Sequence, residues 1–472
     1  MRLKELVENC PAAYSEIDVG SLAYKPEQCE KGALFFCLHG EEEAHQAVNN
    51  GAVCVLSDKA IDNCVNIPVA DIRRSMSFVS ARFYGDPQNS MKFVGVTGTN
   101  GKTTTTYMIA SVLSAAGKKT GIIGTLGAFA GDKQIAFSGM TTPDPPELFR
   151  TLAVMRDLSV EYVVMEVSAH ALALKKTDAV FFEVAAFTNL GSDHMDFFVD
   201  KDSYAAAKES LFLPERRHFA VFNVDDAAGR RFYARYGKNS VTYGLYNPAD
   251  VFAINEQYSL GGVRFVMNLC DDIIKVSCAL PGKCNVYNAL CAAAVCKSLG
   301  VSGSTVTDGL KKLSGVPGRF NVISGVKNKI VIDFAHTAES LKNAICSLKQ
   351  CSGEKIVVVF GCGGDRDKTK RPEMGKVASD NADFCVVTSD NPRFEQPEKI
   401  IDDICSGIKK DNYIAIPERT QAIKYALECA GDNGVVLIAG KGGEKYQEIR
   451  GVKYEYSDET FIRSLIEEKV IE

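Results

Sequence analysis

The turn Gly98-Thr99-Asn100-Gly101-Lys102-Thr103 restricts the possible folds of this chain more than any other segment. It follows a short apolar run, Phe93–Val96, and precedes a segment of helical character at residues 104–116. A strand, a glycine turn and a helix N-terminus in this order bind phosphate, because their backbone N–H groups converge on one point. Lys102 adds a positive charge and Thr103 a hydroxyl suited to Mg²⁺, so the expected ligand is a nucleoside triphosphate.

The turn departs from the strict phosphate-loop pattern at one position. Val96 stands where the first glycine of that pattern belongs, with Gly95 and Gly98 on either side. A glycine turn that only connects a strand to a helix is the structural alternative. The lysine and threonine that follow the turn favour the phosphate-binding interpretation.

Composition limits the domain count and the class of partner. A chain of 472 residues exceeds one ordinary core, which suggests about three domains. Its net charge of −5, from 54 basic and 59 acidic residues, gives no sign of a nucleic-acid partner or of a basic membrane-binding face. Met1–Glu5 leads into no hydrophobic signal segment and no apolar run reaches the length of a membrane span, so we expect a cytoplasmic protein without membrane insertion.

The sixteen cysteines include no Cys-x-x-Cys pair. Cys291/Cys296 and Cys346/Cys351 fall in helix-like segments, and others lie among apolar residues. Reduced thiols that pack as small apolar side chains explain this pattern better than disulfides or metal ligands.

Alternation of buried-type strands with helical stretches predicts an α/β protein with three domains, at residues 1–91, 92–315 and 316–472. The first resembles a small mixed α/β domain. The second predicts a parallel sheet, with Val251–Leu280 expected to form a hairpin around Gly261-Gly262. The third predicts a Rossmann-like, doubly wound unit, with strands that include Ile330–Phe334 and Phe384–Thr388.

Polar residues that directly follow apolar strands are candidates for chemistry, because ligands gather at the carboxyl ends of parallel strands. One group, Glu166, Ser168 and His170, follows Tyr162–Met165, and a second, Asn189, Asp193 and His194, follows Val184–Phe187. A carboxylate and an imidazole beside a polyphosphate are suitable ligands for a divalent ion. A histidine held only for structural reasons is the alternative for His194.

These strings together resemble the Mur ligase family of ATP-dependent amide-bond-forming enzymes. The resemblance spans residues 92 to 460 and rests on Gly98–Thr103, Thr141–Pro143, Met165–Leu172, Thr188–Leu190, Asp193–Asp196, Tyr204–Lys208, Asn285–Asn288, Val316–Arg319 and Asp333–His336. It implies a central P-loop ATPase domain, ATP and Mg²⁺ as cofactors, and small-molecule substrates bound by a monomer. The implied reaction adds meso-diaminopimelate to UDP-N-acetylmuramoyl-alanyl-glutamate through an acyl phosphate, in peptidoglycan precursor synthesis.

The resemblance also implies roles for residues of the central domain. Residues 98–103 would bind ATP, with Lys102 on the transferred phosphates, Asn285 on adenine, Asp333 on ribose and Arg319 on phosphate. Lys102, Glu166, His194 and Lys208 would be catalytic, and the metal ligands would be Thr103, Glu166, His194 and a carbamylated Lys208. Composition alone would assign Lys208 to a solvated helix face.

Two further groups of residues would bind the acid and the amine. Thr141, Thr142, Ser168 and Lys176 would contact the UDP-muramoyl-dipeptide, whose nucleotide would lie on the first domain. The diaminopimelate site would comprise Arg366, Asp390, Asn391, Arg393, Gly440 and Glu444. Arg393 of Asp-Asn-Pro-Arg can bind the distal carboxylate that lysine lacks, although Asp-Asn-Pro alone indicates only a turn.

The chain differs from the family pattern at several positions. Lys25-Pro26-Glu27 replaces a usual Asp-Ser-Arg, Leu174 and Lys176 replace Gln and Arg, Gly443 replaces His, and Gly191-Ser192 replaces Ser-Arg. Most of these changes affect residues that the resemblance assigns to contacts with the nucleotide-sugar substrate. Two alternatives therefore stay open: a paralogous ligase with another carboxylate substrate, and a nucleotide-dependent binding protein that does not ligate.

Overall fold

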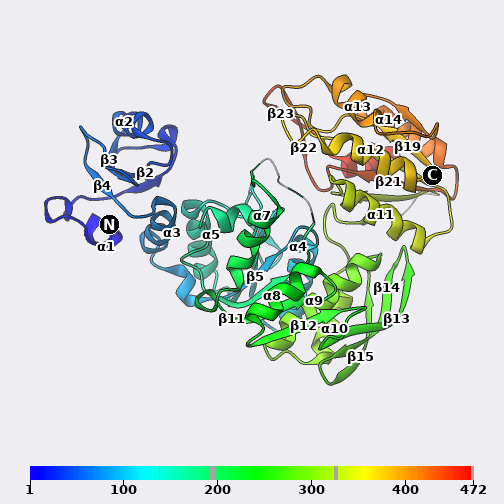
Figure 1. Cartoon of the computed structure of the whole chain (residues 1–472), viewed down its shortest axis with the longest axis horizontal. Helices are drawn as coiled ribbons and strands as arrows, with labels where there is room; N and C mark the ends of the chain where they lie inside the picture. The colour runs from blue at the N-terminus through cyan, green and yellow to red at the C-terminus, as the bar shows by residue number, and fades with distance from the viewer. Residues whose placement is uncertain (138, 192, 194–196, 324–327, 469–472) are drawn as a thin grey trace.

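A computed structural model describes residues 1–137, 139–191, 193, 197–323 and 328–468. It contains three helix-flanked sheets, one after another along the chain, and a two-stranded hairpin. The N-terminal sheet lies at one end of the molecule and the C-terminal sheet at the other, with the large central sheet between them (Figure 1). The predicted α/β class is confirmed.

The N-terminal sheet consists of four parallel strands in the order β1-β2-β3-β4. Its two middle strands are almost entirely apolar and buried, as expected for a parallel sheet covered on both faces. A hydrogen bond from Tyr24 Oη to Glu147 Oε1, 3.1 Å long, connects it to the central unit. The elements are α1 Leu3–Leu6, β1 Ser21–Ala23, β2 Ala33–Phe36, α2 Glu41–Asn49, β3 Ala52–Ser57, β4 Asn66–Pro68 and α3 Ile72–Phe83.

The central sheet has eleven strands in the order β15-β14-β13-β12-β11-β10-β5-β9-β6-β7-β8. Strand β5, which leads into the glycine turn, is parallel to both neighbours, β10 and β9. The strands are β5 Lys92–Thr97, β6 Thr120–Gly124, β7 Gly127–Ala130, β8 Lys133–Ala136, β9 Tyr162–Glu166, β10 Phe182–Phe187, β11 Arg217–Asn223, β12 Ser240–Gly244, β13 Val251–Ser259, β14 Gly262–Leu269 and β15 Asp272–Cys278. The helices are α4 Lys102–Ala115, α5 Pro145–Asp157, α6 Ala169–Ala173, α7 Lys201–Glu209, α8 Ala227–Tyr236, α9 Lys283–Ser298 and α10 Gly303–Lys312.

The segment predicted as a single hairpin, Val251–Leu280, is a three-stranded antiparallel meander instead. The chain reverses a second time at Cys270-Asp271, where Cys270 takes a left-handed φ of 59°. Asp271 is a common turn residue, but the segment lacks the Asn-Gly, Asp-Gly or Gly-Gly pair that most strongly indicates a two-residue hairpin turn.

The C-terminal sheet has the order β16-β17-β21-β18-β19-β20, and only its edge strand β16 is antiparallel. Apolar clusters cover both faces, as in a doubly wound unit. The strands are β16 Asn321–Ile323, β17 Lys329–Asp333, β18 Ile356–Phe360, β19 Phe384–Val387, β20 Tyr413–Ala415, β21 Val435–Ala439 and the hairpin β22 Tyr446–Ile449 with β23 Val452–Glu455. The helices are α11 Ala338–Cys351, α12 Lys370–Asn381, α13 Pro397–Cys405, α14 Arg419–Ala430 and α15 Asp458–Glu467.

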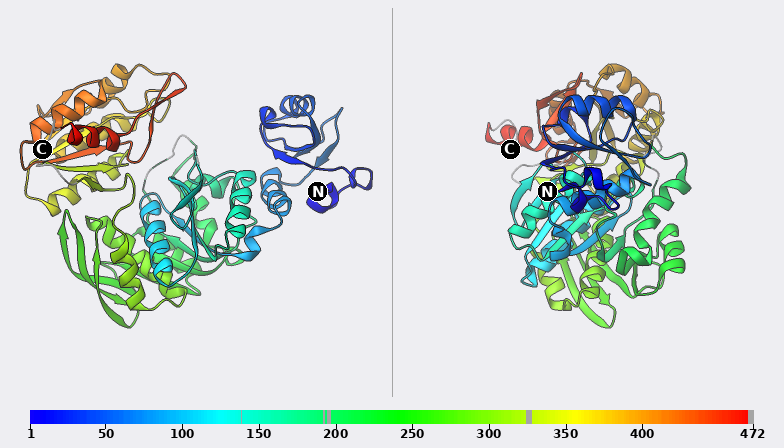
Figure 2. Two further views of the ribbon diagram at one scale, coloured as in Figure 1. Left: turned by 180° about the vertical axis from the view of Figure 1, so that it is seen from behind. Right: turned by 90° about the vertical axis from the view of Figure 1, so that its left-hand side faces the viewer.

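The C-terminal unit contacts the central unit through α11, which packs near α9 and β13. Figure 1 and the left half of Figure 2 both show α11 on the side of the C-terminal sheet that faces the central sheet. Because a short connection, residues 334–337, joins the carboxyl end of β17 to α11, the carboxyl edge of this sheet lies next to the central unit.

A buried ion pair holds α14 and α15 of the C-terminal unit together. Arg419 Nε and Nη2 each donate a 2.8 Å hydrogen bond to the carboxylate of Asp458, and Arg419 also donates to the carbonyls of Ser389 and Ala439. Both side chains are buried. The pair therefore connects the ends of β19 and β21 to the last helix.

We expect Arg419→Ala to lower the free energy of unfolding of the C-terminal unit by about 3–5 kcal/mol, because Asp458 would remain buried without its partner. Urea denaturation followed by circular dichroism measures the change. Arg463→Ala is the matched control, since Arg463 pairs with Glu459 on the exposed face of α15 and should contribute only about 0.3–0.5 kcal/mol. Equal effects of the two substitutions would contradict this account.

Candidate active site

The glycine turn between β5 and α4 is the predicted phosphate-binding loop. Thr99 N donates to the carbonyl of Asn189 at 2.9 Å, and Asn100 N donates to Asn189 Oδ1 at 2.9 Å, so the strand β10 end braces the turn. Lys102 Nζ lies over the turn and donates to the carbonyls of Gly98 and Thr99, at 2.9 and 2.8 Å. Lys102 is also the first residue of helix α4.

Only glycine fits at two positions of this turn. A Cβ atom on Gly98, whose φ is +147°, would overlap Thr188 Oγ1. A Cβ atom on Gly101, whose φ is +84°, would lie 2.5 Å from Asn288 Oδ1. Close packing on Thr188 and Asn288, together with the positive φ values, therefore requires glycine at both points.

Glu166, at the end of β9, is the acidic centre of the site and is buried. Its Oε2 accepts hydrogen bonds from Thr103 Oγ1 at 2.9 Å and from Thr125 Oγ1 at 3.1 Å, and its Oε1 accepts from Thr125 N at 2.8 Å. The carboxylate and the Thr103 hydroxyl thus stand side by side, as two ligands of one divalent cation would.

Lys208, on α7, is buried beside the turn. Its Nζ donates to the Gly98 carbonyl at 2.9 Å and lies 4.3 Å from the centre of the Tyr204 ring. Burial, and to a smaller extent the positive charge of Lys102, lower the pKa of Lys208 well below its ordinary value. In this environment the amine loses its proton easily, and the neutral amine is the form that reacts with CO₂.

Three of the residues predicted to contact the muramoyl-dipeptide, Thr141, Thr142 and Ser168, lie near Glu166 at the carboxyl end of β9. Thr142 Oγ1 donates to the Glu166 carbonyl at 2.9 Å and to Ser168 Oγ at 3.4 Å, and Thr141 Oγ1 is 3.1 Å from Thr125 Oγ1. Lys176 is buried farther along and forms a 2.8 Å ion pair with Asp144. The carboxylate partner of Lys176 within the chain was not predicted from the sequence.

The predicted nucleoside-binding residues come from two domains. Asn285, near the start of α9, is buried, and its Oδ1 accepts from Asn288, which in turn accepts from Thr105 of α4. Arg319 reaches from the C-terminal unit and donates to Thr103 Oγ1 at 3.2 Å. Asp333 accepts from the backbone N–H groups of Phe320 and Ala335, and burial raises its pKa.

The predicted diaminopimelate residues gather at the carboxyl edge of the C-terminal sheet. Asn391 donates to Glu444 Oε2 at 2.9 Å, and a Cβ atom on Gly440 would lie 2.6 Å from Asp390 Oδ2. Arg393 Nη1 donates to the Gly364 carbonyl at 2.6 Å, and its Nε pairs with Glu448 at 3.2 Å. Arg366 is exposed on the loop after β18, and a Cβ atom on Gly363 would lie within 4 Å of both Arg366 and Arg393.

One predicted metal ligand, His194, lies outside the described residues. Among the residues that the structure does describe, no group of three histidine, cysteine, aspartate or glutamate side chains could hold a metal ion. The Thr103–Glu166 pair and Lys208 are therefore the described part of the predicted metal site, and a metal there stays a prediction.

Three residues of the site were not predicted from the sequence. Thr125 orients Glu166 with two hydrogen bonds, but it follows β6 without any recognisable signal. Lys441 is fully buried and donates to Asn391 Oδ1 and Glu444 Oε2, at 2.9 and 3.1 Å. Its position between Gly440 and Gly442 in a conspicuous loop could have indicated it. Glu448, the partner of Arg393, lies in a hairpin that was not predicted.

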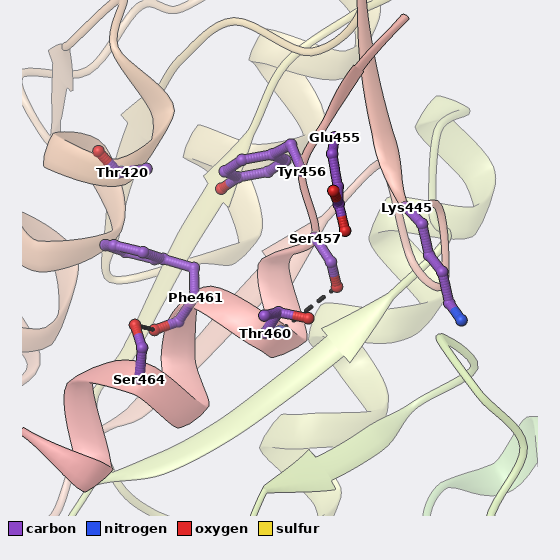
Figure 3. Close-up of a pocket in the computed structure, with 8 residues that line it drawn as sticks. All are labelled: Thr420, Lys445, Glu455, Tyr456, Ser457, Thr460, Phe461 and Ser464. Carbon is purple, nitrogen blue, oxygen red and sulfur yellow. Dashed lines mark hydrogen bonds between the residues drawn. The ribbon is translucent and has the colours of Figure 1, made fainter.

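A pocket with a volume of about 370 Å³ lies beside α15 (Figure 3), lined by Thr420, Lys445, Glu455, Tyr456, Ser457, Thr460, Phe461 and Ser464. None of these residues belongs to the predicted site. Ser457 Oγ accepts the N-cap hydrogen bond of α15 from the backbone N–H of Thr460, and the remaining lining combines polar and charged side chains with the rings of Tyr456 and Phe461.

A glycine turn predicted to bind phosphate, a buried carboxylate beside it and a doubly wound domain that contacts this turn through Arg319 form the arrangement expected of an ATP-dependent ligase. The comparisons agree with this class. Residues 96–296 match the Mur ligase middle domain, and residues 318–442 match the Mur ligase, glutamate ligase domain. The chain belongs to the Mur ligase family.

Two known proteins that match this chain over nearly its full length share more than a third of its residues. The chain is 40% identical to UDP-N-acetylmuramoyl-L-alanyl-D-glutamate–2,6-diaminopimelate ligase 1 of Clostridium acetobutylicum, over 96% of this chain and 95% of the relative. It is 38% identical to the corresponding ligase of Geobacillus thermodenitrificans, over 99% of this chain and all of the relative. A solved structure of such a ligase superposes with a TM-score of 0.71 at 30% identity and covers all of both chains.

Within the described residues, no helix has both the length and the apolar character needed to cross a bilayer.

Proposed function

We propose that this chain ligates meso-diaminopimelate to UDP-N-acetylmuramoyl-L-alanyl-D-glutamate at the expense of ATP. The observation that carries the proposal is the contact of Arg319 with Thr103, at 3.2 Å. Arg319 belongs to the same unit as Asp390, Asn391 and Arg393, so this contact supports a placement of that unit against the phosphate-binding loop. An amine bound at those residues would face an acid activated at that loop. The relatives of this specificity match over nearly the full length of the chain.

The arrangement suits two consecutive steps at one point. In the first step, an oxygen of the substrate carboxylate attacks the terminal phosphorus of ATP and ADP leaves, while Lys102 and Arg319 stabilise the charge that spreads over the phosphoryl oxygens. In the second step, the amine nitrogen attacks the acyl carbon, and phosphate leaves with the electrons of the C–O bond. The chain supplies alignment and positive charge for both steps, and no nucleophilic side chain is needed.

The residues present fit a divalent cation, because a hydroxyl and a buried carboxylate stand together beside the loop. Thr103, Glu166, His194 and carbamylated Lys208 would hold Mg²⁺, which supplies charge neutralisation for phosphoryl transfer. A monomer in the cytoplasm is the assembly and location that we propose, with residues 1–91 binding the uridine nucleotide, 92–315 the ATP and 316–472 the amino acid.

A substrate matrix tests the proposal. Phosphate release is measured with UDP-muramoyl-dipeptide or simpler acids, each crossed with diaminopimelate, lysine and ornithine. We expect turnover only with the UDP-muramoyl-dipeptide and diaminopimelate together. Stimulation by a different acid would support the paralogous ligase, and turnover indifferent to the amine would support a binding protein.

Thr125 should act as a positioning residue for Glu166. Thr125→Val removes the hydroxyl bond at 3.1 Å and keeps the backbone bond, so we expect kcat to fall about tenfold with little change in the KM for diaminopimelate. Steady-state ADP release measures both constants. Thr151→Val, on α5, removes a hydroxyl bonded only to its own helix and should leave kcat unchanged.

A further inference from the structure

His336 lies in the short connection between β17 and α11, on the edge where the two domains meet. Asp333 ends β17 three residues earlier, and Glu339 follows in the first turn of α11. A Cβ atom on Gly191 of the central unit would overlap Glu339 Oε2 and lie 3.3 Å from Thr99 Cγ2. The connection that carries His336 is therefore packed beside the phosphate-binding loop.

Contacts on the other side lead toward the amine-binding edge. Lys370, the first residue of α12, donates to the His336 carbonyl at 3.2 Å. The loop that precedes α12 follows β18 and carries Arg366. Arg319, which contacts Thr103, lies 4.3 Å from the Phe334 ring, and that ring packs against His336 with centres 4.7 Å apart. His336 thus lies between the phosphate-binding loop and the loops that are predicted to bind the amino acid substrate.

Hydrogen bonding fixes the tautomer of this imidazole. Nδ1 lies 2.8 Å from the Phe334 carbonyl, which can only accept, so Nδ1 carries a proton and donates it. Nε2 is then the basic nitrogen, and among the described residues it has no hydrogen-bond partner. The residue as a whole is partly exposed.

We propose that Nε2 of His336 accepts a proton from the reacting ammonium group of the amino acid substrate; this inference rests on the proposed ligase function. At neutral pH that group is –NH₃⁺ and has no lone pair for attack. Transfer of one proton to Nε2 gives –NH₂, whose lone pair forms the bond to the acyl carbon. The second proton leaves the nitrogen with the departing phosphate, and His336 returns the first to solvent.

The surroundings keep the imidazole ready to accept a proton. Burial is the largest effect and lowers the pKa of His336 below its ordinary value of 6.5. Lys370 and Arg319 lower it further, while Asp193 opposes them. His336 is therefore neutral at neutral pH, and Asp193 offers an opposite charge to the imidazolium that forms.

The order of the strands separates His336 from Arg393 along the edge of the C-terminal sheet. Along the sheet the order is β17, β21, β18, β19, so the connection with His336 and the loop with Arg393 are separated by three strand spacings, or about 14 Å. Arg393 leans back over the β18 loop, since its Nη1 reaches the Gly364 carbonyl.

Two amines that differ in charge test the proposal. Hydroxylamine is neutral at neutral pH and traps acyl phosphates as hydroxamates, so it needs no proton acceptor. We expect His336→Asn to slow ligation of diaminopimelate by about 10²–10⁴-fold and to leave hydroxamate formation within a fewfold of wild type. Ligation by the variant should recover as pH rises toward the pKa of the substrate amine, since free amine then accumulates without help.

Two further variants separate this role from a structural one. In His336→Asn, the asparagine amide can still donate a hydrogen bond to the Phe334 carbonyl. In His336→Gln, the glutamine amide lies near the position of Nε2 but is not a base, so this variant should lose ligation to the same extent. His218→Asn, on the exposed part of β11, is the matched control and should leave both activities unchanged. An equal loss of both activities, or no loss of either, overturns the proposal. Failure of the wild-type protein to form hydroxamate from UDP-muramoyl-dipeptide would instead reject the proposed function.

Discussion

Replacement of Lys208 by alanine should slow ligation by at least about 10³-fold, the largest effect that we expect from any single substitution in this chain. Lys208 is buried with its Nζ 2.9 Å from the carbonyl of Gly98, in the wall of the phosphate-binding loop. A carbamate at this position would convert a cation into an anion beside the predicted metal ligands. Coupled ADP release measures the loss, and small carboxylates such as acetate should restore part of the activity.

The pH dependence of the wild-type protein follows from the same side chain. Burial lowers the pKa of Lys208 well below its ordinary value, so its neutral form is present above that lowered pKa and is lost as pH falls through it. Carbamate, and with it ligation, should therefore decline as the medium is acidified. Carbon-13 NMR with labelled bicarbonate detects the carbamate directly.

Lys201→Ala is the control for Lys208, because Lys201 starts the same helix but is exposed. It should ligate at the wild-type rate. If Lys208→Ala retained full activity, or if bicarbonate depletion had no effect on the wild-type protein, the assignment of a carbamate to Lys208 would be wrong.

Replacement of Arg393 by alanine should raise the KM for diaminopimelate by about 100-fold while the KM for ATP stays unchanged. Arg393 is held by Glu448 through Nε and by the Gly364 carbonyl through Nη1, so its guanidinium is fixed before substrate binds. Removing it leaves the distal carboxylate of the substrate without its cation. Lysine lacks that carboxylate, so its poor turnover should change little and the preference for diaminopimelate should disappear.

Arg450→Ala provides a close control for this effect. Arg450 lies on the adjoining hairpin turn, shares a left-handed φ of 50° with Arg393, and donates its backbone N–H to the Arg393 carbonyl. Its side chain is exposed, so the KM should not change. An unchanged KM for diaminopimelate in Arg393→Ala would place recognition of the distal carboxylate elsewhere.

Local patterns in the sequence were sufficient for most of the fold. Strand β5, the glycine turn and helix α4 follow from an apolar run, two obligatory glycines and a helical segment, all of which act between near neighbours. The antiparallel strand β15 was missed because it depends on a reversal at Cys270-Asp271 and on pairing with β14, which no local signal announces.

The sequence by itself determined the chemistry available at each strand end, since Glu166, Lys208 and Arg393 could be named from their positions after strands or in family strings. Only the tertiary structure decided which of these groups meet. Thr125 reaches Glu166 from a neighbouring strand, and Arg319 reaches Thr103 across a separation of 216 residues. Such contacts depend on how sheets and domains pack, and packing is set by the sum of many buried surfaces rather than by any local pattern.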